Sequence, residues 1–324
     1  MPSSPRSQTA TRNTIPAYHC TTKCVRRAFI SGTDPATGRN LDHRRGWILA
    51  KLAELTSIFA IDVCAYAFMA DTWRAVLRPD IARAAAFSEE AVLRRYGKVS
   101  SRVAAEARAG SAADRKRQVA ELRGRLTDIS WMMRIINEMV ARAANKEEEI
   151  SGRFWEGRFK SQELLDGPGL FVATAFVDLS PVRIGERDRA YGGASTSFDQ
   201  RRVEASGKKC PWTSVPLVPF GAEPNRRGKA GFSIRFEGYA EILAWTSKAL
   251  RARQGAALRS NPPAALAKAG VRPAAWLETM TSNGLRATAV GTPAAVAARA
   301  EEMGKAWLSG TALAARLFLD SETD

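Results

Sequence analysis

The chain has 324 residues, with 49 Lys and Arg against 33 Asp and Glu, so its formal net charge at pH 7 is +16. Apolar residues make up 45% of the sequence, enough to bury a core, which excludes a wholly disordered chain. No apolar run reaches the ~18 residues of a membrane helix, and residues 1–12 lack the apolar stretch of a secretory signal. Four cysteines are too few for a disulfide framework. We therefore expect a cytoplasmic protein of one or two domains with no membrane partner.

The charge indicates the class of partner. A strongly basic chain attracts polyanions, of which nucleic acid is the common case and an anionic membrane surface the weaker alternative. The basic excess is spread along the chain rather than gathered in one tail. A chain that is merely rich in Ala and Arg would show the same charge, so charge alone leaves a nucleic-acid partner as a hypothesis.

The predicted elements of the first 180 residues mix strands and helices. Residues 1–14 are expected to form a disordered tail. Apolar and β-branched runs indicate strands, and apolar residues three and four apart indicate helices. In chain order, these patterns predict a strand at 15–24, a turn-rich loop at 31–43, a helix at 45–59, strands at 59–69 and 73–78 joined by a tight turn at 70–72, one or two helices over 80–96, a partly loose polar stretch at 97–120, a helix at 128–146, a loop leading into a strand over 151–165, and a helix at 167–178.

The second part of the chain has a different composition. Residues 186–232 are rich in Gly, Pro and charge and indicate an extended connector, whereas 233–324 is Ala-rich with helical spacing. The order of elements predicts an α+β fold, in which a ferredoxin-like sandwich precedes a helical domain. We divide the chain into a tail at 1–14, a first domain at 15–200, a connector at 201–232 and a helical C-terminal domain at 233–324.

Metal and nucleotide sites have little support in the sequence. The two histidines, His19 and His43, are not at a metal-ligand spacing, and Cys20 and Cys24 lack a second pair of ligands. Neither GxxxxGK nor GxGxxG occurs in the chain. We predict no metal site and no cofactor, and we interpret the cysteines as part of a strand.

Two arginine pairs, Arg26–Arg27 and Arg44–Arg45, flank the turn-rich loop. Guanidinium groups pair with phosphate oxygens in a fork geometry, so these pairs are candidates for contacts with a nucleic-acid backbone. A solvated basic face explains them equally well, and the sequence leaves both interpretations open.

Cations alternate with aromatic and glycine residues between Gly152 and Lys160. Arg153, Arg158 and Lys160 suit a phosphate backbone, while Trp155 or Phe159 suits stacking on a base. The alternative is that the aromatic side chains belong to the core of a short strand and that the arginines face outward. Both interpretations stay open.

Several stretches taken together are similar to a known family. They are YHCT at 18–21, CVRRAF at 24–29, HRRGWI at 43–48, FAIDVCAYAFM at 59–69, WMMR at 131–134, NE at 137–138, ARAAN at 141–145, the segment 152–162, and FVDLSPVR at 176–183. In this order they resemble the HUH single-tyrosine transposase superfamily. The branch that looks most alike is that of the longer relatives of the REP-associated tyrosine transposases. The resemblance covers roughly 15–200 and, more weakly, the C-terminal part.

The resemblance implies a ferredoxin-like or RRM-like HUH domain, with an antiparallel sheet and helices on one face, that binds single-stranded DNA with hairpins. In active members of the superfamily, a His-hydrophobic-His pair on a central strand holds a divalent metal that polarises the scissile phosphate. A tyrosine then attacks and forms a 5′-phosphotyrosine link.

This chain departs from the family pattern at the positions that carry the chemistry. In the frame of residues 69–78, the two histidine positions are occupied by Thr72 and Arg74. Thr is a poor metal ligand, and Arg stays protonated and cannot be one. No tyrosine lies between Tyr96 and Tyr191, and Phe159 stands where we place the tyrosine position. We therefore expect a transposase-derived mobile-element protein, a pseudoenzyme that binds DNA without cutting it.

The blocks around these positions match the family frame. They supply the residues that we expect to contact DNA: Arg26, Arg27, Arg44, Arg45, Arg134, Asn137, Arg142, Arg153, Trp155, Arg158 and Lys160. The partner would be single-stranded or hairpin DNA, with a second copy of the chain possible in a homodimer.

Three alternatives remain. An active transposase or nuclease with non-standard residues would use Asp62, Asp71 or Glu138 to hold Mg²⁺ or Mn²⁺. A decayed element product would bind nothing specific. A protein-interaction module would retain only the scaffold.

Overall fold

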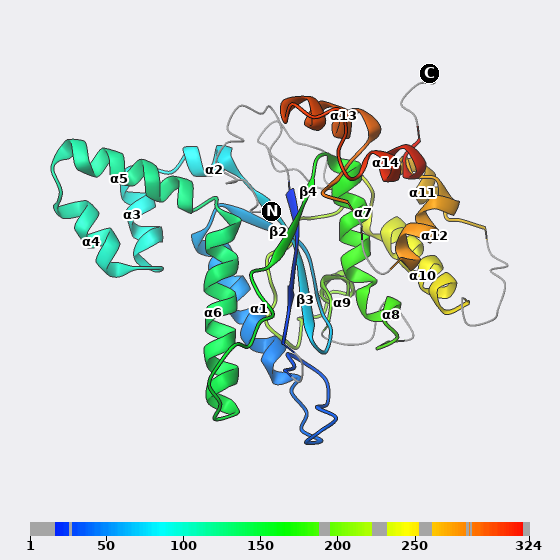
Figure 1. Ribbon diagram of the computed structural model, residues 1–324, viewed down its shortest axis with the longest axis horizontal. Coiled ribbons are helices and arrows are strands. Elements are labelled where there is room, and N and C mark those ends of the chain that lie inside the picture. The colour runs from blue at the N-terminus through cyan, green and yellow to red at the C-terminus, as the bar shows by residue number, and fades with distance from the viewer. Residues whose placement is uncertain are drawn as a thin grey trace.

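The structure is a computed structural model that describes residues 17–25, 28–187, 195–221, 232–252, 261–282, 285 and 287–319. Its centre is a five-stranded mixed sheet with the strand order β2-β3-β1-β4-β5 (Figure 1). The strands are β1 (Ala17–Lys23), β2 (Ile61–Phe68), β3 (Thr72–Pro79), β4 (Lys160–Leu164) and β5 (Ala289–Val290). The fold is α+β, as the sequence predicted.

The central strand β1 pairs antiparallel with both β3 and β4, and β2 pairs antiparallel with β3. The turn between β2 and β3 is tight: the Met69 amide donates to the Thr72 carbonyl at 2.8 Å. The short strand β5 pairs parallel with β4. Predicted strands at 15–24, 59–69 and 73–78 therefore correspond to described strands of nearly the same extent.

Helices account for most of the remaining described residues. They are α1 (His43–Ile58), α2 (Ile81–Ala85), α3 (Glu89–Gly97), α4 (Ser101–Ala109), α5 (Ala112–Arg125), α6 (Ile129–Glu147), α7 (Gly167–Asp178), α8 (Ser180–Arg183), α9 (Ser197–Ala205), α10 (Phe236–Ala252), α11 (Ala264–Lys268), α12 (Pro273–Thr281), α13 (Pro293–Glu302) and α14 (Thr311–Leu317). None of these described helices is long and apolar enough to cross a membrane.

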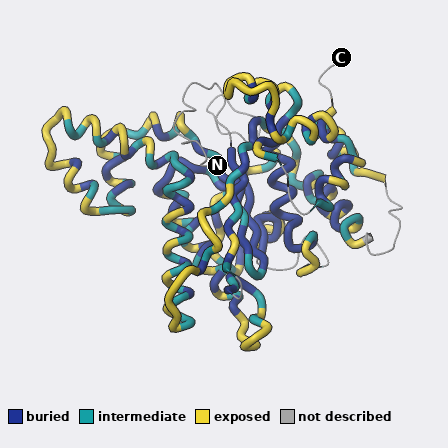
Figure 2. Tube along the Cα trace, viewed as in Figure 1, coloured by how far each residue is buried: buried dark blue, intermediate teal, exposed yellow. Residues whose placement is uncertain are grey.

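Helices α1 and α6 cover one face of the sheet. Their apolar residues recur three and four positions apart, as Leu52 and Leu55 do in α1, so each helix buries one stripe. The strands contribute alternate side chains to the same hydrophobic cluster, including Cys20 of β1 and Trp73 of β3. In Figure 2, which colours the Cα trace by burial, the central strands are mostly dark blue, whereas α6 alternates between buried and exposed residues.

Helix α7 covers the opposite face. Every residue from Gly169 to Asp178 is buried, because this helix is apolar nearly all round and has protein on each side. The expectation of an antiparallel sheet with helices on one face is therefore corrected in two respects. The sheet is mixed, because β5 runs parallel to β4, and both faces carry helices.

The C-terminal helices pack against α7. Asp178, at the end of α7, accepts hydrogen bonds from Ser197 Oγ at 2.6 Å and Tyr239 Oη at 2.6 Å, which joins α7 to α9 and α10. Burial raises the pKa of Asp178 to about 6. At the other end, Arg299 of α13 forms a bidentate ion pair with Glu163 of β4, with both distances at 2.8 Å. The division at 200 and 232 stays a prediction.

Two stretches differ from their predicted structure. Residues 97–120 are helical rather than loose: α4 and α5 form, with α3, an arm that projects from the sheet (Figure 1). Ser100 and Ser111 cap these helices, and Ala107, Val119 and Leu122 are buried within the arm. The predicted connector at 186–232 contains α9, whose capping box at Thr196 and Asp199 starts the helix. Residues 188–194 and 222–231 lie outside the described part.

Candidate nucleic-acid interface

A row of polar side chains crosses three strands on the α7 face of the sheet. In the strand register, Thr21 of β1 lies opposite Arg74 of β3 on one side and Lys160 of β4 on the other. Neighbours of these residues, Cys20 and Trp73, face α1 and α6, so alternation puts the row on the opposite face. The row therefore brings two cations from distant parts of the chain to one surface.

Arg74 is partly buried beside α7. Its guanidinium carbon lies 5.4 Å from the centre of the Phe176 ring, and its Nε has no hydrogen-bond partner within the described structure. Burial lowers the pKa of Arg74 to about 10, an effect that the charge of Asp71 partly offsets. The group stays protonated at neutral pH.

A second guanidinium, that of Arg183 on α8, lies against the same ring at 3.6 Å from its centre. Arg183 Nη2 donates to the Phe176 carbonyl at 3.0 Å and to Ser180 Oγ at 2.7 Å. Its Nη1 is buried and has no partner among the described residues. Burial, followed by the charge of Arg74, lowers the pKa of Arg183 well below its usual value.

His19 is neutral and lies beside Phe176, with the two ring centres 5.9 Å apart. Its Nδ1 donates to Gln162 Oε1 at 3.2 Å, and its Nε2 accepts from Thr21 Oγ1 at 3.4 Å, which assigns the tautomer. Burial, followed by the charge of Arg74, lowers the pKa of His19 to about 3, although Gln162 opposes the shift. The ring therefore adds no third positive charge to the cluster.

Thr72 and Arg74, which the sequence resemblance aligns with two histidines, lie on this face. Thr72 is the first residue of β3. It is buried, and its hydroxyl donates to Asp71 Oδ1 at 2.7 Å. Phe159 is not with them, because it packs against the cluster on the α1 and α6 face. Phe176 is instead the aromatic residue beside Arg74. Sequence analysis did not single out Phe176 or Arg183, although both lie in the stretch FVDLSPVR that carries part of the resemblance.

Aromatic side chains anchor the segment before β4. Phe154 is buried, and Trp155 donates its indole N–H to the Asn137 carbonyl at 2.8 Å. The backbone of the segment also bonds to the end of β1, where the Glu156 amide donates to the Lys23 carbonyl at 2.9 Å. These contacts favour the interpretation of Trp155 as an anchor rather than as a free stacking surface.

The cations of this segment point to solvent. Arg153, Arg158 and Lys160 are exposed, and within the described residues none of them forms an ion pair or a side-chain hydrogen bond. The nearby carboxylate of Glu156 is already engaged by Lys23 at 3.1 Å. The segment therefore presents three positive charges without local compensation.

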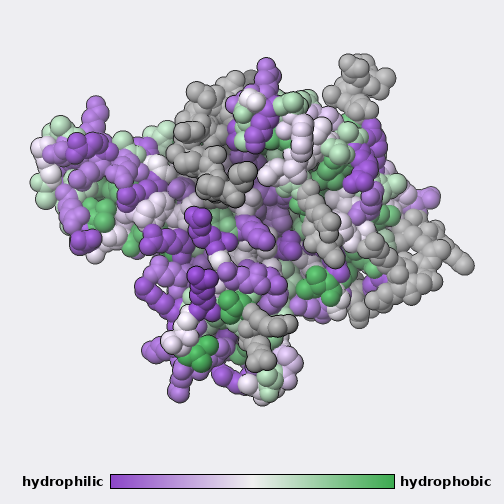
Figure 3. Space-filling model, viewed as in Figure 1, coloured by the Kyte–Doolittle hydropathy of each residue, from purple (hydrophilic) through white to green (hydrophobic). Residues whose placement is uncertain are grey.

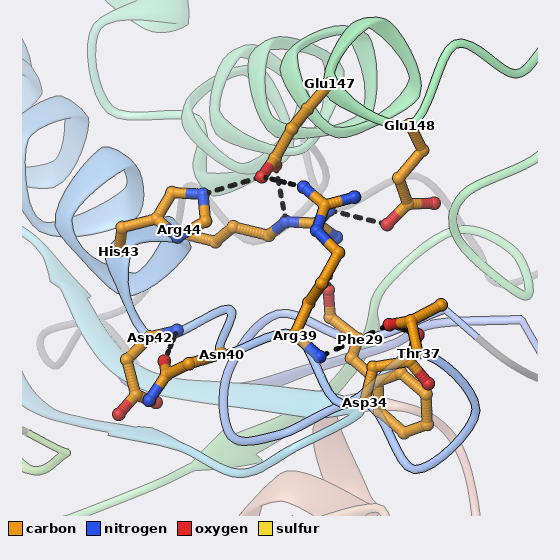
Figure 4. Close-up of polar contacts among 10 residues, drawn as sticks. All are labelled: Phe29, Asp34, Thr37, Arg39, Asn40, Asp42, His43, Arg44, Glu147 and Glu148. Atoms are coloured by element: carbon orange, nitrogen blue, oxygen red, sulfur yellow. Dashed lines mark hydrogen bonds and ion pairs between the residues drawn. The ribbon is translucent and has the colours of Figure 1, made fainter.

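Arg44 has a structural role instead. Its side chain is fully buried, and it donates to Glu147 Oε2 at 2.8 Å, Glu148 Oε1 at 2.5 Å and the Phe29 carbonyl at 2.7 Å (Figure 4). The two glutamates lie at the end of α6, so this ion pair ties α1 to α6. In this arrangement a phosphate cannot reach Arg44, and we withdraw it from the expected DNA contacts.

Arg45 is also engaged within the fold. Its guanidinium forms an ion pair with Asp42 at 2.9 Å and donates to Ser195 Oγ at 2.8 Å. Arg26 and Arg27 lie outside the described residues, so their prediction is left as it was.

Helix α6 presents a mixed surface. Arg134 and Arg142 are exposed, and both pair with Glu138, at 3.9 and 2.5 Å. Asn137 faces inward: it accepts from Trp73 Nε1 at 3.2 Å and donates to Thr22 Oγ1 at 3.3 Å. Figure 3 shows hydrophilic side chains over much of α6 and of the arm.

The carboxylates of the alternative metal site are not gathered. Asp62 binds Arg78 and Arg83, both at 2.7 Å, on β2, whereas Asp71 lies in the β2–β3 turn and Glu138 on α6. Among the described residues, no three His, Cys, Asp or Glu side chains come together as a metal site would require.

Comparison with known proteins gives little further information. No protein-family model and no curated protein matches the chain. One solved structure is similar, that of a REP-associated tyrosine transposase bound to a REP hairpin, at 11% sequence identity and a TM-score of 0.37. The match covers 66% of this chain and 96% of that chain.

Proposed function

We propose that this protein is a transposase-like DNA-binding protein that holds single-stranded or hairpin DNA on the α7 side of the sheet without cutting it. The observation that carries the proposal is the set of three exposed cations, Arg153, Arg158 and Lys160, without acidic partners on an anchored segment. Such groups are suited to a phosphate backbone, since they lose no internal ion pair on binding. The +16 net charge supports the same class of partner.

The arrangement of the first domain supports the resemblance on which the proposal depends. The elements β1, α1, β2, β3, α6 and β4 follow one another in the order of a ferredoxin-like unit, apart from the inserted arm. Their strands lie in the order β2-β3-β1-β4, with α1 and α6 on one face. We propose a ferredoxin-like core, to which α7, β5 and the C-terminal helices are added.

The side chains at Arg74, Phe159 and Phe176 lack the groups that strand cleavage needs. A metal-dependent cut needs ligands with lone pairs, and Arg74 offers none. Covalent attack needs a hydroxyl, and both Phe159 and Phe176 lack one.

The proposal is tested with purified protein on labelled hairpin DNA and on linear single-stranded DNA, with and without Mg²⁺ or Mn²⁺. We expect retardation in a native gel and no nick or covalent adduct in a denaturing gel. A metal-dependent nick or a protein–DNA adduct would favour the active-nuclease alternative. Absence of any salt-sensitive DNA binding would contradict the proposal.

A paired variant locates the surface. Arg158→Ala with Lys160→Ala removes two phosphate contacts, so we expect weaker binding and a salt slope that is reduced by roughly 1.4, from about 0.7 for each contact with a single strand. The control is Arg94→Ala, which removes an exposed arginine on α3 in the arm. Equal effects of the two variants would mean that only the total charge matters.

A further inference from the structure

Two guanidinium groups share one aromatic ring inside the α7 face. Arg74 from β3 and Arg183 from α8 lie 5.4 and 3.6 Å from the centre of the Phe176 ring. Each keeps one buried N–H group without a partner in the described structure, Nε of Arg74 and Nη1 of Arg183. Buried donors are nearly always paired in folded proteins. Two unpaired donors on neighbouring guanidinium groups therefore indicate that an acceptor binds between them.

The surrounding charges do not provide this acceptor. Asp71 acts on Arg74 at a distance, but its carboxylate accepts from Thr72 and lies 3.8 Å from Lys23. Glu186 accepts from the Ala70 amide at 2.9 Å. Among the described residues, neither arginine has a carboxylate within ion-pair distance. Two like charges are therefore held together without an anion from the protein.

The neighbouring histidine is arranged to be neutral. Hydrogen bonds from His19 to Gln162 and from Thr21 to His19 use both ring nitrogens, and burial lowers the pKa of His19 to about 3. The cluster thus consists of the guanidinium groups of Arg74 and Arg183 beside a neutral His19 ring. Neutral His19 limits the repulsion that an empty site must bear.

We propose that Arg74 and Arg183 together form a phosphate-binding site. The inference rests on the proposed function in one respect: the phosphate is a phosphodiester of the bound DNA. Guanidinium groups donate in a rigid fork that matches phosphate oxygens, and two of them from different elements can hold two oxygens of one group. Arg74 reaches the site from β3 and Arg183 reaches it from α8, so the two donors approach from different elements.

The strand register extends the site toward a polymer. Lys160 lies in the same row as Arg74 with one strand between them, which separates their backbones by roughly 10 Å. The exposed Arg158 precedes it in the chain. A single small anion would leave these cations unused, whereas a chain of phosphates reaches both ends of the row.

The first experiment uses inorganic phosphate as the probe. The melting temperature of the full-length protein is measured in sodium phosphate and in sodium chloride at equal ionic strength. We expect phosphate to raise the melting temperature of the natural protein, because a ligand of the folded state stabilises it. The double variant with Arg74→Met and Arg183→Met should lose this shift, and Arg94→Met should retain it.

The same double variant has a second expected property. Without phosphate it should melt at about the same temperature as the natural protein, because removal of two repelling cations and two unpaired donors offsets the loss of the hydrogen bonds from Arg183 to Phe176 and Ser180. If the double variant fails to fold, Arg183→Lys carries the test: it keeps the charge but loses the fork, and the phosphate-induced shift should fall. A phosphate-induced shift of equal size in natural and variant proteins would overturn the site, as would no shift in the natural protein.

The second experiment distinguishes DNA from free phosphate as the source. If the bound group is a phosphodiester, Arg183→Met should weaken hairpin-DNA binding by about ten- to hundredfold, the range for hydrogen bonds to charged groups. Unchanged DNA affinity with loss of the phosphate-induced shift would overturn the DNA assignment. The proposed function is tested separately by DNA binding of the natural protein and by the Arg158 and Lys160 variant, so the two failures are distinguishable.

Discussion

The two faces of the sheet are made by the same strands but differ in whether their buried polar side chains have partners. On the face toward α1 and α6, Asn137 joins Trp73 to Thr22, and Arg44 is enclosed by two glutamates. On the face toward α7, Arg74 and Arg183 keep donors without acceptors. Arg44 and Asn137 on the first face are paired within the described residues, whereas on the second face Arg74 and Arg183 each keep a buried donor for which we propose a phosphate acceptor.

This difference predicts that paired cations contribute to stability and that unpaired cations contribute to binding. A buried cation with its acids stabilises the fold once formed, since removing it strands the acids. A pair of cations without acids lowers stability and is retained where it serves another purpose. The contrast predicts that equivalent substitutions on the two faces have opposite consequences.

The largest expected effect compares one arginine from each face. Arg44→Met should lower the free energy of unfolding by roughly 3 kcal/mol, because Glu147 and Glu148 lose their inner partner. Arg74→Met should leave it unchanged or raise it, because Arg74 has no ion pair to lose. Urea denaturation measures both. Arg39→Met is the control, since this exposed partner of Glu147 should cost less than about 1 kcal/mol. Equal losses at Arg44 and Arg74 would abolish the contrast.

The next effect concerns pH. The pKa of His19 is about 3 in the folded protein, against about 6.5 in the unfolded chain. The unfolded chain therefore binds the extra proton first, and the stability due to neutral His19 is lost as pH falls from 6.5 toward 3. Between pH 7 and pH 5 this loss should be about 2 kcal/mol.

His19→Asn tests this assignment, because its amide can still donate to Gln162 but does not titrate. The variant should show a smaller difference in unfolding free energy between pH 7 and pH 5 than the natural protein does. The same difference in both proteins would assign the acid sensitivity to other groups.

A smaller effect distinguishes the structural role of Asn137 from the binding role expected of Arg134, both on α6. Asn137→Ala should cost roughly 1–2 kcal/mol of stability, because Trp73 Nε1 and Thr22 Oγ1 lose their partner, and should leave DNA affinity unchanged. Arg134→Ala should do the reverse, with little change in stability and weaker DNA binding. Denaturation and a binding titration on both variants measure the four quantities. Reduced DNA affinity of folded Asn137→Ala would restore Asn137 as a DNA contact.

The smallest effect concerns the exposed pairs of Glu138 with Arg134 and Arg142. Glu138→Gln should change the free energy of unfolding by less than about 0.5 kcal/mol, since exposed pairs four residues apart contribute little. It should strengthen DNA binding slightly, because two arginines lose their acid. A weaker complex would show that Glu138 itself takes part in binding.

The predictable part of the fold is the part with clear periodicity. Apolar spacing located α1 and α6 within a few residues, and branched and aromatic runs located β2 and β3. The helices α4 and α5 were missed because their stretch is polar and Ala-rich. They form through serine caps and through burial of a few residues, such as Ala107 and Leu122, inside the arm.

For the candidate site residues, the local sequence predicted which cations are exposed in some cases but not in others. The pattern of Arg153, Arg158 and Lys160 between aromatic residues indicated a basic surface, and these cations are exposed and unpaired in the described structure. Arg44 carries the same charge and stands beside an exposed histidine, yet it is buried. Its partners Glu147 and Glu148 lie about a hundred residues further along the chain, and no local signal connects them.

The sequence by itself determined the charge, four of the five described strands and the principal helices, because these follow from residue types and their spacing; the short strand β5 was not predicted. Only the tertiary structure decided which cations are enclosed and which are left without an acid. Arg74 and Arg183 are more than a hundred positions apart, and they meet on Phe176 because the sheet and α7 pack face to face. Residue types fix the charges that a chain carries, whereas packing fixes the groups that each charge faces.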